Sequence, residues 1–343
     1  MLYNHDKISF VNTPTPIDYL ENVSKDLGVN FYLKRDDLTC LGMGGNKLRK
    51  LEYLLKDAKD KGATMLLTTG GAQTNHGRLT AAVAAKYGMK CAIVAVDPYP
   101  GEISANLLLD GMMGCPVYLV KDDGVHSEGE LAKAAFKKVT EEWEAKGEKV
   151  YFIPIGGSSE VGMLGYYDCA LELEQQIKEM KLENPRVITT VGSQGTYMGL
   201  AAAVRNENLS FHVTGVGISP VKEGIKVKAE KYYKRCQDFL GLKENMTAED
   251  FDLEDAYDFG AYNNPVKEVR EAVYYMARKE AIIFDPCYTG KCFAGIMSMI
   301  KEGKIKQGED IIMVHTGGFP GNYTKHHRVE MEKELMPYIH IID

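Results

Sequence analysis

The sequence lacks the features that mark membrane-spanning, secreted and nucleic-acid-binding proteins. No apolar run reaches the roughly 20 residues that cross a bilayer, and the segment Met1–Lys7 contains no apolar signal core. No basic tract offsets the net charge of -7, so nucleic acid is not an expected partner. We therefore expect a cytoplasmic protein that acts on small molecules, with neither a membrane nor a nucleic acid as its partner.

The seven cysteines are scattered, odd in number and without a Cys-x-x-Cys pair. This pattern favours reduced thiols over a disulfide framework or a zinc site. His326 and His327 stand alone in a polar tail, without the further ligands that a metal site needs. We predict no metal site. What the chain does have is 343 residues with 45% hydrophobic content, which is enough for two domains or one large core.

Short apolar runs alternate with segments of helical periodicity along most of the chain. The runs predict strands at 64–69, 91–96, 116–120, 150–153, 187–191, 212–218, 282–284 and 310–315. Helices are predicted at 48–61, 75–87, around 107–109, and at 128–146, 162–178, 198–205, 222–240, 266–280 and 291–304, with a turn at 98–101. Continuous apolar strands that are each followed by a helix indicate parallel sheets covered on both faces. We therefore predict an α/β fold with two doubly wound, mostly parallel sheets and an active site in the cleft between the two domains.

Lys47 lies at a position that packing alone explains poorly. It follows the flexible turn Gly44-Gly45 and precedes a helical pattern whose apolar residues recur from Leu48 to Ala58. The turn holds the stem of the lysine while its amine reaches into a cleft. A desolvated amine loses its proton readily, which suits a lysine that forms a Schiff base with a carbonyl cofactor. The alternative is an ordinary solvated lysine at the start of a helix.

The segment Gly192-Ser193-Gln194-Gly195-Thr196 lies between an apolar strand and a helix. Small residues at such a junction let backbone N–H groups converge on a phosphate, and the helix N-terminus adds a positive dipole end. Tight packing of the turn is the alternative. Two known nucleotide-binding motifs are excluded elsewhere in the chain. A Walker loop ending at Lys291 would need glycine at position 285, where the chain has Asp285. Lys47 likewise stands where a dinucleotide fingerprint would continue with glycine.

A second strand–turn–helix junction, Gly70–His76, ends in Thr-Asn-His. Thr74 is a candidate helix cap, and the hydroxyl and amides of this turn are a candidate carboxylate site; both roles can hold together. Asp285–Lys291 and His315–Gly318 follow two further predicted strands. Because ligands of open α/β sheets gather at the carboxyl ends of strands, we expect these segments, the Gly192 turn and Lys47 to share one cleft.

Taken together, these segments resemble the pyridoxal-phosphate (PLP) enzymes of the tryptophan-synthase-β-like fold (fold type II), in the family of D-cysteine desulfhydrase and 1-aminocyclopropane-1-carboxylate (ACC) deaminase. The most specific motif is Gly-Gly-Asn-Lys-x-Arg-Lys-Leu-Glu at residues 44–52. The matching segments follow in order: Lys34–Asp37, Gly44–Glu52, Gly70–Arg78, Gly192–Thr196, Asp285–Lys291 and His315–Gly318. The resemblance implies a homodimer in which residues 1–47 and 162–343 form a large PLP-binding domain and residues 48–161 form a small α/β domain.

The resemblance also implies roles for individual residues. Lys47 would carry the Schiff base with PLP and then act as the general base on a small amino-acid substrate. Asn75 would contact the phenolic oxygen of the cofactor. Thr74, where the family usually has serine, would touch the substrate together with Asn75 and His76. The cofactor phosphate would be held by Lys50 and by the amides of Gly192, Ser193, Gln194, Gly195 and Thr196.

Tyr262 and Tyr288 match the two tyrosines that flank the family's site, and either is a candidate proton donor because free tyrosine has a pKa of about 10. By the same resemblance, Thr289 and Thr316 would lie beside the cofactor. The resemblance implies glutamate and leucine at these two positions in the deaminases and threonine at both in the desulfhydrases. A carboxylate near the pyridine nitrogen deepens the electron sink, whereas a hydroxyl does so weakly, which suffices when a β-substituent can leave. We therefore predict α,β-elimination of D-cysteine to pyruvate, hydrogen sulfide and ammonia.

Several residues depart from the family pattern and leave the substrate open. Thr74 replaces serine, and Asn263 replaces a usual glycine. Phe319 follows the final Gly-Gly where relatives commonly have a small residue, so it is a candidate wall of the substrate pocket. The alternatives are a lyase for another β-substituted amino acid, such as L-cysteate, and the ring-opening ACC deaminase. A non-catalytic α/β protein that binds a phosphorylated metabolite is the alternative from another class.

Overall fold

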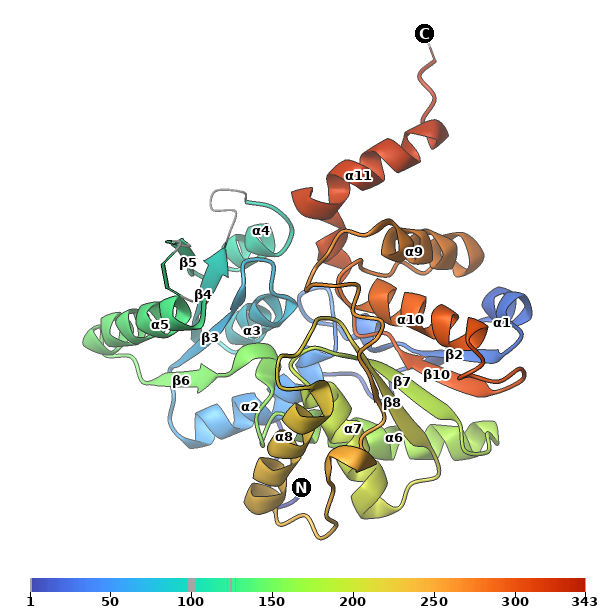
Figure 1. The fold of residues 1–343 in the computed structure, drawn as a ribbon. Coiled ribbons are helices and arrows are strands. Elements are labelled where there is room, and N and C mark those ends of the chain that lie inside the picture. Colours follow the sequence, from blue (N-terminus) through green and yellow to red (C-terminus); the bar gives the residue numbers. More distant parts are fainter. Residues whose placement is uncertain (1, 98–102, 122, 124, 127, 343) are drawn as a thin grey trace.

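The computed structural model describes residues 2–97, 103–121, 123, 125–126 and 128–342, and their strands form two separate sheets (Figure 1). The larger sheet has the strand order β1 (Ile17–Tyr19), β2 (Asn30–Lys34), β10 (Asp310–Val314), β7 (Arg186–Val191), β8 (His212–Gly217) and β9 (Leu253–Glu254). The smaller has the order β5 (Val117–Lys121), β4 (Lys90–Asp97), β3 (Met65–Gly71) and β6 (Val150–Ile153). Neighbouring strands are parallel except β1, which is antiparallel to β2. The predicted pair of mostly parallel sheets is confirmed.

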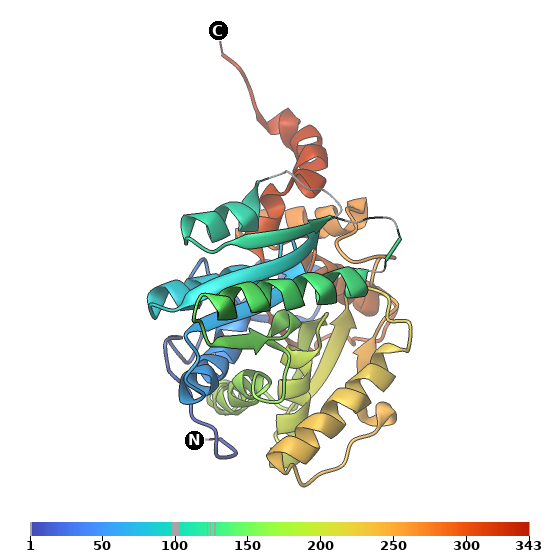
Figure 2. The ribbon, with the colours of Figure 1, turned by 90° about the vertical axis from the view of Figure 1, so that its left-hand side faces the viewer.

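Helices cover both faces of each sheet, as the continuous apolar strands predict (Figures 1 and 2). One face of the larger sheet packs against α6 (Leu164–Met180), α7 (Gly195–Glu207) and α8 (Ile225–Leu240). Its other face packs against α1 (Glu21–Leu27), α9 (Lys267–Glu280), α10 (Thr289–Lys301) and α11 (Lys325–Leu335). The smaller sheet lies between α5 (Glu128–Ala145) on one face and α2 (Lys47–Asp60) and α3 (Asn75–Lys86) on the other, with α4 (Ala105–Met112) next to α3.

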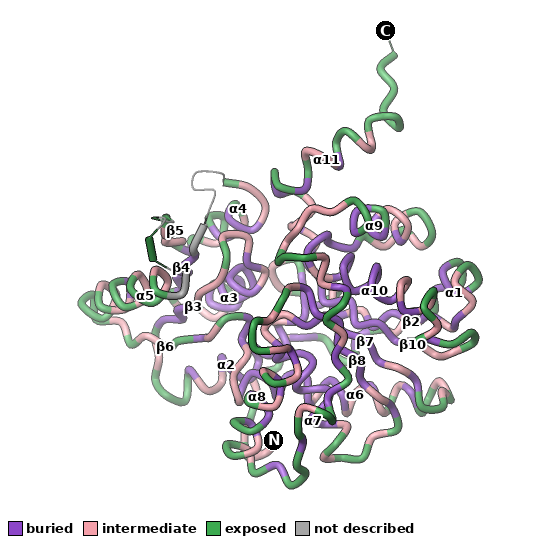
Figure 3. The backbone as a smooth tube through the Cα atoms, in the orientation of Figure 1, coloured by how far each residue is buried: buried purple, intermediate pink, exposed green. Residues whose placement is uncertain are grey.

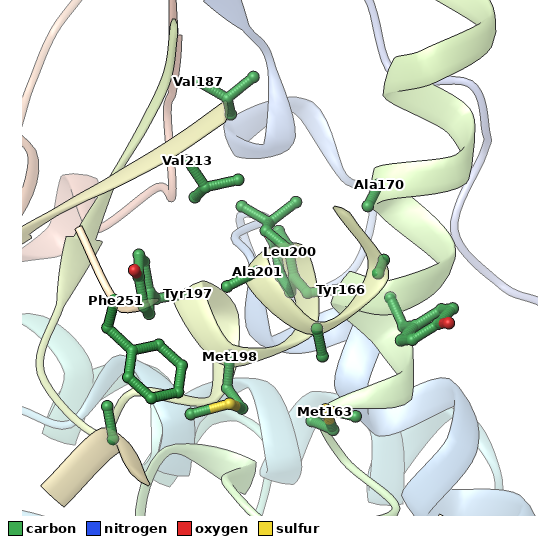
Figure 4. Close-up of a cluster of buried hydrophobic side chains, with 14 of the residues drawn as sticks. Met163, Tyr166, Ala170, Val187, Tyr197, Met198, Leu200, Ala201, Val213 and Phe251 are labelled. Atoms are coloured by element: carbon green, nitrogen blue, oxygen red, sulfur yellow. The ribbon is translucent and has the colours of Figure 1, made fainter. Parts of the chain in front are cut away.

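Helix α7 is buried along residues 195–203, close to the centre of the molecule, where Figure 3 shows mostly buried backbone. It lies between the larger sheet and α6, and Figure 4 shows Leu200 among side chains of both neighbours. A Cβ at Gly199 would lie 2.5 Å from the carbonyl oxygen of Met163, so glycine permits the close approach of α7 and α6. This packing fixes the N-terminus of α7, which begins at Gly195, relative to the end of β7.

The strand predicted at 282–284 is wrong, because these residues do not form a strand. Phe284 is buried and packs edge-on against Phe293 and His315. Its carbonyl oxygen accepts a hydrogen bond from the side-chain amide of Asn322, 3.1 Å away. The apolar run therefore belongs to the core. The backbone carbonyl of Phe284, however, is hydrogen-bonded by the Asn322 side chain and not by the backbone of a neighbouring strand.

Two regions are more regular than the sequence predicted. Residues 17–34, for which the sequence analysis predicted no helix or strand, form β1, α1 and β2, so the N-terminal segment is part of the larger sheet. The polar tail around His326 and His327, for which no element was predicted, forms α11, and His327 is buried. The turn predicted at 98–101 lies outside the described residues. Within the described ranges, no helix combines the length and the apolar character of a membrane span.

A buried ionic network joins the N-terminal segment, α2 and α6. The Arg49 guanidinium donates to both carboxylate oxygens of Asp36, at 2.8 and 2.9 Å, and to both of Glu172, at 2.9 Å each. Lys34 also pairs with Glu172. Although burial alone raises the pKa of the Asp36 carboxyl, Arg49 and then Lys34 hold that pKa below its usual value. Because Arg49 lies two residues after Lys47, this network fixes the first turn of α2 against the larger sheet.

Replacing Arg49 with methionine is expected to destabilise the protein by about 3 to 5 kcal/mol, because Asp36 is left as a buried charge without its main partner. The shift of the urea unfolding midpoint at constant slope measures this loss. Lys56→Met, on the same helix but in an exposed pair with Asp60, is the control and should leave the midpoint in place. Equal midpoints for the two variants would contradict the assigned role of Arg49.

Candidate active site

A cavity of about 1730 Å³ is lined by residues that follow the carboxyl ends of β3, β7 and β10. The predicted convergence of the strand-end turns on one cleft therefore agrees with the structure. The predicted site residues that line the cavity are Lys47, Thr74, Asn75, His76, Gly192, Ser193, Gln194, Thr196, Tyr262, Tyr288 and Thr316. Four others, Lys50, Gly195, Thr289 and Phe319, lie outside this lining.

Lys47 begins α2 at the edge of the cavity, after a turn that only glycine allows. Gly44 and Gly45 have φ angles of 67° and 132°, and a Cβ at Gly44 would lie 2.2 Å from the carbonyl oxygen of Asp37. The next amide, of Asn46, donates to the carbonyl oxygen of Thr316 at 3.1 Å. The turn thus fastens the start of α2 to the end of β10 and aims Lys47 at the shared cavity.

The amine of Lys47 is prepared to act as a nucleophile. Its only hydrogen bond among the described residues goes to Oδ1 of Asn46, at 2.9 Å. Burial lowers the pKa of the amine to about 8; Asp285 opposes this effect, and the positive charge of Arg78 adds to it. Roughly one amine in ten is therefore unprotonated at neutral pH, far more than for a free lysine. This is the state that attacks a carbonyl group.

Lys50 lies one turn further along α2 and is buried behind the N-terminus of α7. Its ammonium donates to the carbonyl oxygen of Gly156 at 3.1 Å, and a Cβ at Gly195 would lie only 2.8 Å from its Nζ. Burial, and then the charge of Lys47, lower the pKa of Lys50 well below its usual value. Ser158 completes this corner, because its Oγ accepts from the Gly195 amide at 3.1 Å and pairs with Ser193 Oγ at 2.8 Å.

The loop Gly192–Thr196 has the geometry of an anion cradle. Gln194 has a left-handed φ of 68° and caps α7, so the loop turns sharply into the helix. The positive end of the α7 dipole lies at this corner of the cavity, and the Lys50 amine lies directly behind it, next to Gly195. Asn46 ties the loop to the Lys47 turn, since its Nδ2 donates to Thr196 Oγ1 at 2.8 Å. A doubly charged phosphate fits this concentration of donors and positive charge.

The Thr74 turn also lines the cavity. Thr74 Oγ1 accepts from the Gly77 amide at 3.2 Å, so the predicted cap of α3 is confirmed. Asn75 Oδ1 accepts from Asn106 Nδ2 at 3.0 Å, which orients the Asn75 side chain. The His76 ring contacts Thr68 Oγ1 at 2.9 Å. Burial, with Lys47 and Lys50, lowers the His76 pKa well below its usual value, so this ring is neutral.

Asp285, which the sequence analysis did not select, organises the start of α10. Its carboxylate accepts from the amides of Cys287, Tyr288 and Thr289 at 2.8 to 2.9 Å and from the Thr289 hydroxyl at 2.8 Å. Burial raises the pKa of Asp285 in spite of these hydrogen bonds. The Thr289 side chain is therefore engaged with Asp285 rather than exposed to the cavity, while Asp285 itself lines the cavity.

Two tyrosines meet at the cavity. The hydroxyls of Tyr262 and Tyr288 are 2.5 Å apart, and the rings are nearly perpendicular with centroids 5.9 Å apart. Burial, and then the neighbouring Cys287, raise the pKa of both phenols well above the usual value. Both hydroxyls therefore stay protonated at neutral pH, and as a hydrogen-bonded pair they can donate a proton into the cavity.

The end of β10 places Thr316 and Phe319 differently. Thr316 Oγ1 lies in the cavity, 3.5 Å from Thr190 Oγ1, another lining residue that the sequence analysis passed over. The Phe319 ring instead packs on Tyr323, with centroids 5.5 Å apart. The structure thus puts Gly321 and Thr324, not Phe319, in the cavity lining. Among the described residues, no group of three or more potential His, Cys, Asp or Glu ligands gathers for a metal.

Comparison with known proteins decides the family. A family model described as pyridoxal-phosphate-dependent enzymes matches residues 8–317. The chain belongs to this family. It is 38% identical to a putative ACC deaminase of Pyrococcus abyssi over 338 residues, covering 98% of each chain. It is 36% identical to a D-cysteine desulfhydrase of Salmonella typhimurium over 329 residues, covering 94% of this chain and 97% of the relative.

A crystal structure of an ACC deaminase homologue matches with a TM-score of 0.85 at 34% identity, over 98% of this chain and 97% of that one. The protein is thus a fold type II PLP-dependent enzyme of the ACC deaminase and D-cysteine desulfhydrase family. The residues present fit PLP, because the Lys47 amine and the Lys50 corner offer a nucleophile and an anion site in one cavity.

Ser158 and Asp285 are the main site residues that the sequence analysis missed. Ser158 follows β6 in the stretch Ile155-Gly156-Gly157-Ser158-Ser159, a strand followed by small residues like the two turns that were selected. That pattern was an available signal. Asp285 was noticed only as the residue that excludes a Walker loop, although a carboxylate ahead of a helix is itself a capping signal.

Replacing Lys50 with methionine is expected to weaken the affinity for PLP at least about tenfold, because a charge-assisted contact to the phosphate is lost. Binding of pyridoxal, which lacks the phosphate, should be unchanged. Titration of the cofactor-free protein with each compound, followed by absorbance, measures both affinities. Lys56→Met on the exposed side of α2 is the matched control. An equal loss for both compounds would show that Lys50 acts on the fold rather than on the phosphate.

A second buried network supports Asn75 from behind. Arg78 Nε donates to Asn106 Oδ1 at 2.7 Å, and its Nη2 donates to the carbonyl oxygen of Gly44 at 3.3 Å. Arg78 therefore links the support of Asn75 to the turn before Lys47.

Neither carboxyl oxygen of the fully buried Asp110 has a hydrogen-bond partner within the described residues. Burial raises the pKa of Asp110 to about 7, although the charge of Arg78 opposes the shift.

This raised pKa predicts a pH-dependent stability. A carboxyl whose pKa is higher in the folded state contributes fully to stability below its unfolded value of about 4 and loses that contribution as the pH rises through about 7. Asp110→Asn keeps the neutral form, so its stability relative to the natural protein should increase between pH 5 and pH 8.5, by on the order of 3 kcal/mol. Thermal unfolding across this range measures the difference. A difference that does not change with pH would refute the assignment.

Proposed function

We propose that the protein is a carbon–sulfur lyase that eliminates the β-substituent of D-cysteine, giving pyruvate, hydrogen sulfide and ammonia. The observation that carries the proposal is the pairing, across one cavity, of an amine with a pKa of about 8 and two protonated phenols. Elimination needs both a base at the α-carbon and an acid at the leaving sulfur. Of the two threonines that we associate with the desulfhydrases, Thr316 lies in the cavity, and its hydroxyl favours sulfide loss over ring opening; Thr289 bonds to Asp285 instead.

The residues of this chain divide the work. When bound, PLP withdraws electrons from the substrate's α-carbon. Lys47 removes the α-proton, a task for which its lowered pKa is matched to neutral pH. The Thr74–His76 turn at the N-terminus of α3 orients the substrate carboxylate. Tyr288, hydrogen-bonded to Tyr262, donates a proton to the departing sulfur, and the released enamine hydrolyses to pyruvate and ammonia.

We also propose a division of the chain that follows its sheets. Strands from residues 1–47 and 162–343 make the larger sheet, and strands from residues 48–161 make the smaller one. The first set would form a large domain that carries the phosphate loop and both tyrosines. The second would form a small domain that carries the Thr74 turn. Substrate would enter between them, and two copies of the chain would assemble as a homodimer.

Lys47→Ala and Lys47→Arg are expected to abolish the visible absorption of the bound cofactor and to slow elimination on the order of 10³-fold or more. Arginine keeps the positive charge but cannot form the Schiff base or act as a base near neutral pH. Absorbance spectra of the purified variants and an assay of sulfide release test this. An arginine variant that keeps both signals would remove Lys47 from the mechanism.

A substrate panel tests the reaction itself. The panel contains D- and L-cysteine, D- and L-cysteate and ACC, and the assay measures pyruvate, sulfide, sulfite and 2-oxobutyrate. We expect sulfide and pyruvate in equal amounts from D-cysteine, with the highest kcat/KM of the panel. Formation of 2-oxobutyrate from ACC without sulfide from D-cysteine would establish the deaminase instead. Sulfite from cysteate as the dominant product would identify a sulfo-lyase.

A further inference from the structure

Tyr262 is carried by an irregular loop that needs an explanation for its position. Residues 258–265, here called the tyrosine loop, lie between β9 and α9 and contain neither helix nor strand. Half of the Tyr262 surface is exposed, yet its hydroxyl meets Tyr288 at 2.5 Å. Loops without ladder or helix hydrogen bonds are the parts of a protein that move most easily. The contacts that hold this loop therefore determine whether the two phenols meet.

Lys291 holds the first half of the tyrosine loop. Its ammonium is fully buried and donates to the carbonyl oxygens of Asp258 at 2.7 Å, Ala261 at 2.5 Å and Ile218 at 2.9 Å. These three acceptors use all three of its N–H groups. Lys291 lies three residues after Tyr288, in the first turn of α10. The same helix turn therefore carries one tyrosine and fastens the loop that carries the other.

Helix α11 holds the second half of the loop through Asn263. Asn263 Oδ1 lies 2.6 Å from His327 Nε2, and its backbone oxygen lies 2.9 Å from His326 Nε2. His327 is 1% exposed, and burial lowers its pKa to about 3, so the ring is neutral and donates from Nε2. Asn263 has a left-handed φ of 56°, a conformation that asparagine tolerates better than most residues with a side chain.

We propose that Lys291 and the Asn263–His327 pair are positioning residues that hold Tyr262 against Tyr288, so that protonation of the leaving group depends on them. This inference rests on the proposed elimination. It assigns a function to Lys291 and to Asn263, which stands where the family usually has glycine. It also assigns one to α11, a helix that the sequence analysis did not predict. Each contact acts on the backbone of the tyrosine loop rather than on substrate or cofactor.

The Asn263–His327 contact offers clean variants. Asn263→Gly removes the side-chain contact and suits the left-handed backbone, so the fold is retained. His327→Leu removes the donor, whereas His327→Gln keeps an N–H donor near the position of Nε2 and should restore function. Lys333→Gln, on the exposed side of α11 where Lys333 pairs with Glu330, is the control. Thermal unfolding of each PLP-loaded variant verifies that it remains folded.

The decisive readout separates proton removal from leaving-group loss. In D₂O, Lys47 should still exchange the α-proton of D-cysteine in Asn263→Gly and His327→Leu, whereas elimination should slow at least about tenfold. The ratio of exchange to elimination therefore rises in both variants, returns towards the natural value in His327→Gln, and stays constant in Lys333→Gln. The double variant should lose no more than the worse single variant, since both act through one contact.

Amide hydrogen exchange of residues 258–265, measured by mass spectrometry, gives a second readout that does not depend on activity. We expect faster exchange in Asn263→Gly and His327→Leu than in the natural protein and the Lys333→Gln control. Unchanged exchange in both variants, or an equal slowing of α-proton exchange and elimination, would overturn the inference. If the natural protein releases no product from any amino acid of the panel, the proposed function fails instead, while the loop measurement still decides whether the contacts hold the loop.

Discussion

Positive charge buried at one corner of the cavity is the constraint on which the site depends. Lys47 and Lys50 lie one helical turn apart, and Arg78 adds a third cation behind them. Burial lowers the pKa of both lysines; Arg78 adds to this effect at Lys47 and Lys47 adds to it at Lys50, while Asp285 opposes it at Lys47. One cause therefore has two effects: the amine of Lys47 is ready to react, and a doubly charged phosphate gains more here than it would in an open, solvated groove.

The fold brings this charge together through short, rigid connections. The Arg49 network fixes the first turn of α2 to the larger sheet, and the burial of α7 fixes the loop that faces it. Asn46 then bridges the two, with contacts to the end of β10 and to Thr196. The start of α2, the loop before α7 and the end of β10 are thus attached to one another at the cavity. A site built in this way holds its geometry before any ligand arrives.

Most of the architecture and the place of Lys47 at the cavity were predictable from the sequence because their signals are local. Continuous apolar runs indicate parallel strands, and glycines before Lys47 and Gly195 indicate backbone close to a ligand. The same reasoning failed where a contact with a residue distant in the sequence decides the local structure. Phe284 takes a side-chain amide as its backbone partner, and α11 is polar by composition but packs through His327 and Met331. Ser158 acts through Ser193 and Gly195, which lie far away in the sequence. Asp285 instead caps the helix start that directly follows it, which is a local signal that the sequence analysis did not use.

The segment that begins at Asp285 shows how one motif supports several functions. Asp285 caps the start of α10 through three amides, and Thr289 both donates to its carboxylate and accepts from its backbone amide. A carboxylate in place of Thr289 would lie beside Asp285, whose pKa is already raised by burial, and the repulsion between two carboxylates would raise the pKa of one of them further. The hydroxyl at position 289 therefore keeps Asp285 as the single acceptor at this helix end. Since Asp285 also accepts from the Tyr288 amide, the residue at 289 acts through Asp285 on the turn that carries Tyr288, without entering the cavity.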